Sequence, residues 1–170
     1  MLKFSQDYHL STFQKQTNWM LLFRLGFDIF NIAQPDTNVY TANCAAGQSC
    51  LTNSRTQCQR AQFMASQDGP AAPTICGTNT GYHMILEAED NCNVLTFTWD
   101  SDSTREWNIH ISQILCSDPH KPPQGCLQYF TGTTGNIASY NFQGGTHLAN
   151  QVNYCCFPSK FLILTFPALQ

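Results

Sequence analysis

Charged residues are unusually scarce in this sequence. Only 11% of its 170 residues are Asp, Glu, Lys or Arg, whereas the share in soluble domains is roughly a quarter. The formal net charge is −3, so the chain has no basic surface that would suit nucleic acid. No run of like charges forms an interaction tail. The polar surface must therefore come from Ser, Thr, Asn and Gln, as is common in secreted all-β domains.

Long apolar runs are also missing. The most apolar stretch, residues 19–30, is interrupted by Arg24, Gly26 and Asp28, and a transmembrane helix needs about 20 apolar residues. We therefore expect no transmembrane segment. Residues 1–15 lack the apolar centre of a secretory signal peptide, which predicts that the true start of the protein lies outside this sequence.

Cysteine, in contrast, is abundant, with nine residues. This density indicates either disulfides formed in an oxidising compartment or a zinc site. Zinc sites are built from closely spaced ligands such as C-x-x-C, a motif that the chain lacks, so disulfides and an extracellular, secreted protein are favoured. Because nine is odd, at least one cysteine is free or joins another molecule, which allows a disulfide-linked oligomer.

Several segments alternate apolar and polar residues with the period of two that places one set on one face of a strand. These segments are residues 23–29, 95–99, 107–111 and 138–142. Clusters of Gly, Pro, Asn, Asp and Ser separate them, and no segment has a sustained helical stripe. The pattern predicts an all-β chain folded as an antiparallel β-sandwich. After the first segment, Phe30 and Ile32 change face across Asn31, which predicts a β-bulge there.

One short segment is rich in proline. Pro119, Pro122 and Pro123 stand within the run SDPHKPP, and proline stiffens the chain and removes backbone donors. We therefore expect a linker at this point. The resulting division is an unassigned segment at 1–20, a first unit at 21–116, the linker at 117–125 and a second unit at 126–170.

Two longer strings stand out, PTICGTNTGYHM at residues 73–84 and CLQYFTGTTG at residues 126–135. A Ser-Tyr-Asn strand and the string HLANQ, at residues 147–151, follow the second one. In this order the strings resemble CUB domains, which are extracellular β-sandwich modules, and in particular those of arthropod secreted proteins. The shorter patterns RLGFDIFNIA, at residues 24–33, and VLTFTWDSD, at residues 94–102, fit the same family.

The resemblance implies a jelly-roll-like CUB sandwich that is incomplete at both ends. The unit at 21–116 lacks the opening strands of the family, and the unit at 126–170 stops about halfway through the family's pattern. Each half-sandwich alone would leave an apolar face open. We therefore expect the second unit to cover the core of the first, through the apolar faces of residues 138–142 and 161–166. The alternative is a non-functional fragment of a larger CUB protein.

The expected disulfides number four. Three of them follow the resemblance, and the first closes a small loop outside the family's pattern. The pairings are Cys44–Cys50, Cys58–Cys76, Cys92–Cys116, and Cys126 with Cys155 or Cys156.

Many CUB domains bind calcium through three carboxylates, and the resemblance locates those positions here. The glutamate position falls at residues 33–34 and the first aspartate position near Ala61, and only the loop that holds Asp100 and Asp102 stays acidic. Calcium takes six to eight oxygen ligands, so the loss of two carboxylates predicts no bound calcium and no other cofactor. Asp100 and Asp102 are interpreted as polar turn residues of a residual calcium loop.

No catalytic motif is present: the sequence has no G-x-S-x-G elbow, H-E-x-x-H or P-loop, so we predict that the protein is not an enzyme. The resemblance implies an extracellular binding or scaffolding module that recognises protein or carbohydrate through loops at the sandwich ends. Tyr129 and Phe130 are the best exposed candidates, because adjacent strand residues face opposite ways. The alternative is a structural secreted protein of cuticle or matrix. Other aromatics at strand spacing are interpreted as core: Tyr82, Trp99, Trp107 and Tyr140.

Overall fold

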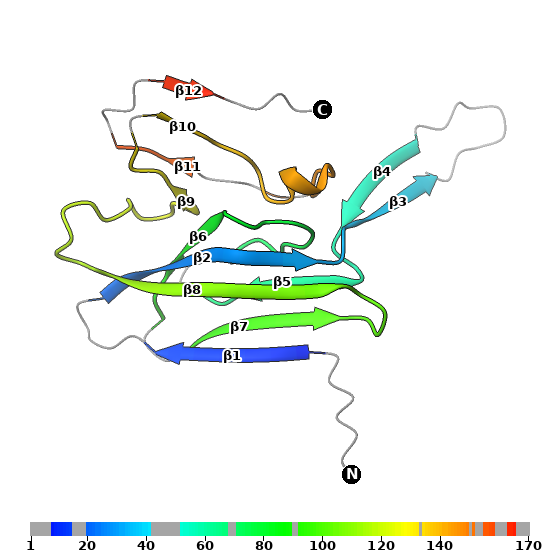
Figure 1. Cartoon of the computed structure of the whole chain (residues 1–170), viewed down its shortest axis with the longest axis horizontal. Helices are drawn as coiled ribbons and strands as arrows, with labels where there is room; N and C mark the ends of the chain where they lie inside the picture. Colours follow the sequence, from blue (N-terminus) through cyan, green and yellow to red (C-terminus); the bar gives the residue numbers. More distant parts are fainter. Residues whose placement is uncertain are drawn as a thin grey trace, which may run out of the picture.

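The computed structural model describes residues 8–14, 20–41, 52–67, 71–89, 92–132, 134–149, 151, 155–158 and 163–165. Within these residues the regular structure is β-strand, apart from one 3-10 helix (Figure 1). The first strands are β1 (Tyr8–Gln14), β2 (Met20–Ile32), β3 (Asp36–Thr41), β4 (Thr52–Gln57), β5 (Ala61–Ala65), β6 (His83–Glu87), β7 (Cys92–Trp99) and β8 (Arg105–Leu115). The remaining elements are β9 (Gln128–Tyr129), β10 (Thr134–Asn136), the helix η1 (Phe142–Gly144), β11 (Cys155–Cys156) and β12 (Ile163–Thr165).

Two three-stranded antiparallel sheets form the body of the molecule. Their strand orders are β1-β7-β5 and β6-β2-β8, and Figure 1 shows β8 beside β2 and β1 beside β7. Buried residues of both sheets belong to one hydrophobic cluster, which is the arrangement of a β-sandwich. The predicted all-β, antiparallel β-sandwich is therefore confirmed. In the described part of the chain, no helix is long and apolar enough to cross a membrane.

The long strand β2 contains a bulge that decides which of its residues are buried. Its register against β8 shifts between Phe27 and Ile29. The extra residue, Asp28, reverses the faces of the residues after it, so Phe27 and Phe30 are both buried while Ile29 is 36% exposed. The bulge predicted at Asn31 is therefore wrong in position. The change of face must come before Phe30, because that ring packs into the core.

Four phenylalanines form the centre of the core. They come from both sheets, and their contacting ring centroids lie 4.8–5.9 Å apart. All of them are at most 3% exposed, and burial of each contributes about 2–3 kcal/mol. Tilted and edge-to-face pairs of this kind favour a fixed packing geometry. The four are Phe27, Phe30, Phe63 and Phe97.

The same core continues beyond the proline-rich segment. Leu127, Tyr140 and Leu148 belong to the hydrophobic cluster of the sandwich, and the ring of Tyr140 lies 6.4 Å from that of Phe27. Tyr140 thus covers the core of the first unit, as the closure hypothesis expected. Residues 161, 162 and 166 of the second expected covering segment lie outside the described residues. The division into units remains a prediction, but the hydrophobic core itself crosses the expected linker.

Short strands carry this C-terminal segment. β9 pairs with β11 and β10 pairs with β12, both in parallel, which differs from the antiparallel pairing of the main sheets. The backbone N–H of Ile85 in β6 donates to the carbonyl of Leu127 at 2.8 Å, which holds the segment beside the sheet. Residues 138–142, expected to be a strand, are instead a loop that enters η1. The reason is Asn141, whose φ of 60° ends the extended backbone.

Candidate functional site

The predicted bridge Cys58–Cys76 is present, with 5.7 Å between the two Cα atoms. Cys76 is fully buried, and Cys58 packs against the core. The bridge ties the segment before β5 to the segment that contains Ile75, which also pairs with Phe63. A disulfide that closes a loop of this size contributes about 3 kcal/mol. It fixes the start of the turn at residues 77–81, which carries part of the candidate site.

The second bridge joins Cys126 to Cys156, again with 5.7 Å between the Cα atoms. The parallel pair of β9 and β11 places Cys156 opposite Tyr129 and Cys155 opposite Gln128. Adjacent strand residues face opposite sides, so only one of the two neighbouring cysteines can reach Cys126. Cys155 stays a thiol, and its Sγ donates to Gln128 Oε1 at 3.2 Å. Burial raises the pKa of the Cys155 thiol.

The predicted bond between Cys92 and Cys116 is wrong. Cys92 begins β7 in one sheet, whereas Cys116 follows β8 in the other. A disulfide needs Cα atoms within roughly 7 Å of each other and Cβ atoms that face one another, and these two strand ends do not form that bond. The predicted pair Cys44–Cys50 lies outside the described residues.

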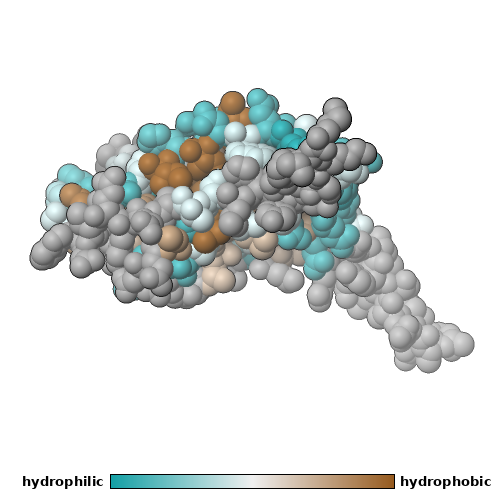
Figure 2. Space-filling view, turned by 90° about the horizontal axis from the view of Figure 1, so that it is seen from below, coloured by the Kyte–Doolittle hydropathy of each residue, from teal (hydrophilic) through white to brown (hydrophobic). Residues whose placement is uncertain are grey.

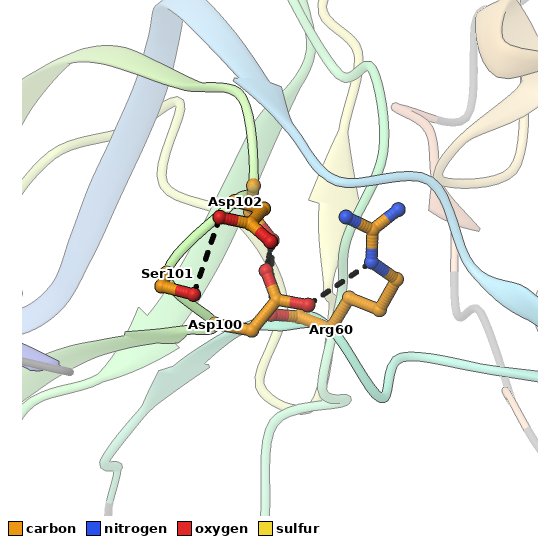
Figure 3. A network of polar contacts seen from close by, with 5 residues as sticks. Arg60, Asp100, Ser101 and Asp102 are labelled. Carbon is orange, nitrogen blue, oxygen red and sulfur yellow. Dashed lines mark hydrogen bonds and ion pairs between the residues drawn. The ribbon is translucent and has the colours of Figure 1, made fainter.

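The side chains of the acidic turn between β7 and β8 pair with one another and with Arg60, which precedes β5 (Figure 3). The guanidinium Nε of Arg60 lies 3.0 Å from Asp100 Oδ2, and the backbone N–H of Asp100 donates to the carbonyl of Arg60 at 2.8 Å. The hydroxyl of Ser103 donates to the other oxygen of Asp100. Hydrogen bonds from Ser103 and Arg60 lower the pKa of Asp100. Asp102 accepts from Ser101 in the same turn, so we name these residues the sandwich-end network.

The resemblance to CUB domains locates a calcium site in this region, and the residues do not fit it. Gln34, Asp36, Arg60 and Asp102 do line one hollow of about 450 Å³. An amide occupies the expected glutamate position, and the Arg60 guanidinium stands beside the expected first aspartate at Ala61. Asp100 and Asp102 interact electrostatically with Arg60, as does Asp36. A divalent cation would have to displace this guanidinium or share its carboxylates with it.

The string at residues 73–84 meets the Ser-Tyr-Asn segment that follows the second string at the turn of residues 77–81. Thr78 N–H donates to Asn141 Oδ1 at 2.9 Å, and Asn141 N–H donates to Asn79 Oδ1 at 2.7 Å. Both asparagines are fully buried. On folding, each therefore gives up hydrogen bonds to water and gains these internal hydrogen bonds instead. Gly77 has a φ of 79°, and a Cβ on it would overlap Asn141. Glycine is therefore required there by the close approach of the two segments.

Beside this junction lies a cleft of about 470 Å³, which we name the seam cleft. One wall is the end of the turn and the start of β6, and the other is formed by β9, β10, the loop after β10 and η1. Three aromatic rings, three side-chain amides and one imidazole line it, and none of the lining residues is Asp, Glu, Lys or Arg. These residues are Gly81, Tyr82, His83, Gln128, Phe130, Asn136, Ala138, Phe142 and Gln143.

His83 holds the two walls of the seam cleft together. Its Nε2 accepts the backbone N–H of Tyr129 at 2.9 Å, and its carbonyl accepts the hydroxyl of Tyr140 at 2.9 Å. Its ring lies 5.1 Å from that of Phe130 in an edge-on arrangement. Burial, followed by the charge of Arg24, lowers the pKa of His83 to about 4. The ring is therefore neutral at physiological pH, with its proton on Nδ1.

The structure separates the two predicted binding residues. Phe130 lines the seam cleft and stacks on Phe157, with 5.8 Å between ring centroids. Tyr129 is half-buried, lies outside the cleft lining, and bonds His83 only through its backbone. Whether either binds a ligand stays a prediction. Of the aromatics interpreted as core, Tyr140 is core, Trp99 and Trp107 pack at its margin, and Tyr82 does so while also lining the cleft.

Sequence reasoning missed Phe142, Asn136 and Gln143. Phe142 was expected on the apolar face that covers the core, yet it is 38% exposed. The turn at Asn141 takes it out of the strand pattern and onto η1. The signal that could have found it is the string YNFQGG, in which Asn and Gly are typical of a turn.

Large apolar side chains are also exposed outside the described lining of the seam cleft. Figure 2 shows apolar residues gathered among hydrophilic ones on the face seen from below Figure 1. Apart from Phe142, the large exposed apolar side chains among the described residues are Ile29 on β2 and Ile111 and Leu115 on β8. Their exposed fractions are 36–44%. None of these three residues lines the seam cleft, the hollow beside Arg60 or the hollow beside Thr56 and Gln57. Their exposure matches that of Phe142, so they are suitable control positions.

Comparison with known families adds one finding. Residues 123–160 match the sequence profile of the animal CUB domain, a partial match that contains the string CLQYFTGTTG and both cysteines of the second bridge. CUB domains are in general extracellular binding modules without catalytic activity. Searches of curated proteins and of solved structures each gave no match.

Proposed function

We propose that this chain is an extracellular, secreted, non-enzymatic binding module for a protein or carbohydrate ligand, and that its ligand site is the seam cleft. The observation that carries the proposal is the composition of that cleft. Ligand pockets of roughly 300–1,000 Å³ combine aromatic walls with a few polar groups, and the seam cleft has this size and this lining. Phe130, Asn136, Phe142 and Gln143 of the lining also lie within the segment that matches the CUB profile.

The sandwich-end loops, expected from the sequence to bind the ligand, support the proposal less well. Arg60 and Asp100 neutralise each other, and Ser103 is used by the same carboxylate. A ligand at that end would have to compete with these bonds. In the seam cleft, by contrast, the exposed ring of Phe142 needs no such exchange.

The arrangement of His83 supports a binding role over catalysis. It is the one histidine of the cleft lining, and its Nε2 lone pair already accepts the backbone N–H of Tyr129. A general base needs that lone pair within reach of the proton that it abstracts. Among the described residues, no group of three His, Cys, Asp or Glu side chains could hold a metal ion.

The test is a binding screen of the secreted protein against immobilised glycans and a displayed peptide library. We expect at least one class of ligand to bind, and Phe142→Ala to weaken that binding roughly tenfold or more. Ile111→Ala is the control, because Ile111 has nearly the same exposure (36% against 38%) and lies on β8. Binding that Ile111→Ala weakens and Phe142→Ala leaves intact would place the site elsewhere.

A structural secreted protein is the second candidate. Cys116 is a partly exposed thiol, and such a thiol can form a bond with another molecule. If the same preparation runs as a disulfide-linked multimer that Cys116→Ser abolishes, and no ligand binds to the monomeric variant, this second function replaces the first.

A further inference from the structure

We propose that the ligand of the seam cleft is a neutral saccharide unit of one or two sugar rings. This inference rests on the proposed function and names its ligand class. The described residues that line the cleft provide three aromatic side chains, three amides and one neutral imidazole, and none of them is charged. A sugar ring has an apolar C–H face and a rim of hydroxyls, and each kind of surface has a matching group in this lining.

The aromatic rings supply the apolar contact. Phe142 is 38% exposed and stands on the rim at η1, and Phe130 and Tyr82 are each about half-buried in the walls. Phe130 is held in place by His83 on one side and Phe157 on the other. A ring that is already fixed loses little conformational freedom when a ligand packs against it.

The amides supply polar contacts of both kinds. Gln128 is buried, and its Oε1 accepts the Cys155 thiol, so the donor function of this side chain belongs to its Nε2. Gln143 donates its Nε2 to the carbonyl of Thr80 at 3.1 Å, so its Oε1 is the group left to accept. Asn136 is exposed at the end of β10 and has both functions. A hydroxyl both donates and accepts, so it can use either kind of group.

Charge complementarity decides against the other ligand classes. Among the described lining residues no cation would neutralise a sulfated or carboxylated sugar, and no anion would neutralise a basic peptide side chain, so burial of either charge is unfavourable. Arg24, whose charge acts on His83, is exposed and lies outside this lining. Gly81 leaves the mouth of the cleft open, because a Cβ built on it meets no atom within 4 Å. The volume of about 470 Å³ is large enough for one or two rings and too small for a folded segment of a partner protein.

The test uses the full chain and ligand-observed NMR with named sugars. The probes are cellobiose, lactose, chitobiose and mannobiose at about 10 mM, a concentration that detects millimolar affinity, with sialyllactose and a sulfated disaccharide as charged counterparts. We expect at least one neutral disaccharide to bind, and the charged sugars to bind more weakly. Phe142→Ala should weaken binding at least tenfold, while Phe142→Tyr and Ile111→Ala should retain it.

Two results would overturn the inference. One is the absence of binding by every neutral sugar to the folded protein; the other is binding that is equal in the wild type and in Phe142→Ala. A displayed peptide library separates this failure from that of the proposed function. Peptides that need Phe142, together with sugars that do not bind, would refute the saccharide and keep the cleft as the ligand site. If neither peptides nor sugars bind, both proposals fail.

Discussion

The sandwich-end network and the seam cleft differ in the use of their polar groups. At the sandwich end, Arg60, Asp100 and Ser103 satisfy one another, although their acidic turn was the most conspicuous chemistry of the sequence. The described lining of the seam cleft contains no charged residue, and the groups it offers for contact are amides and aromatic rings. The polar groups of the acidic turn are thus used to hold the turn and to pair it with Arg60, which lies 40 residues earlier in the sequence. The candidate site arises where two distant strings meet.

The largest expected effect on stability comes from adding a methyl group at Gly77, where the turn of residues 77–81 meets Asn141. Gly77→Ala should destabilise the protein by about 2–4 kcal/mol, because a positive φ and a clash with Asn141 act together. Gly81→Ala is the matched control: its φ of 83° is similar, but its Cβ would meet nothing, so a loss of about 1 kcal/mol is expected. Chemical denaturation measures both, and equal losses would mean that the junction adds nothing to the backbone effect.

The next effect is a pH dependence of stability that arises from His83 at the seam cleft. The pKa of His83 is lowered to about 4 in the folded protein, so as pH falls below 6.5 the unfolded chain binds a proton that the folded chain does not. Stability should therefore be full above pH 6.5 and fall by up to ~3 kcal/mol towards pH 4.

Denaturation midpoints at several pH values test this expectation. His83→Gln keeps an acceptor for Tyr129 N–H and has no proton to bind in this range, so the slope between pH 6.5 and 4 should become shallower. The exposed histidine at position 120 provides a matched substitution outside the seam cleft, His120→Gln, with which the slope of His83→Gln is compared. A wild-type slope that His83→Gln does not alter would locate the pH dependence in other groups.

The smallest effect is expected at the sandwich end. Arg60→Gln removes an exposed ion pair, and exposed pairs contribute little and are screened by salt. The melting temperature should fall slightly at low salt and not at high salt. Calcium at about 1 mM should not change the melting temperature of the wild type, because Arg60 shares the carboxylates. A clear calcium-dependent rise that EDTA reverses would contradict this expectation.

The sequence predicted the class of fold well and the site only in part. Alternation along residues 95–99 and 107–111 predicts strands, and β7 and β8 contain them, because period-two burial is a local property. The bulge of β2 is set by packing against the opposite sheet, which no local pattern contains. The choice between Cys155 and Cys156 depends on the register of β9 and β11. Phe142 leaves the strand pattern because of one residue, Asn141, with a positive φ.

The shared core has a consequence for the order in which the protein can fold. Phe27 and Tyr140 contact each other across 113 residues (140 − 27), with 6.4 Å between ring centroids. Chains dominated by such distant contacts fold slowly, in milliseconds to seconds. During synthesis at about 5–20 residues per second, the aromatic face of β2 waits roughly 6–23 s for the residue that covers it. A newly made chain therefore depends on protection of that face, so its yield of folded protein should be sensitive to chaperone supply.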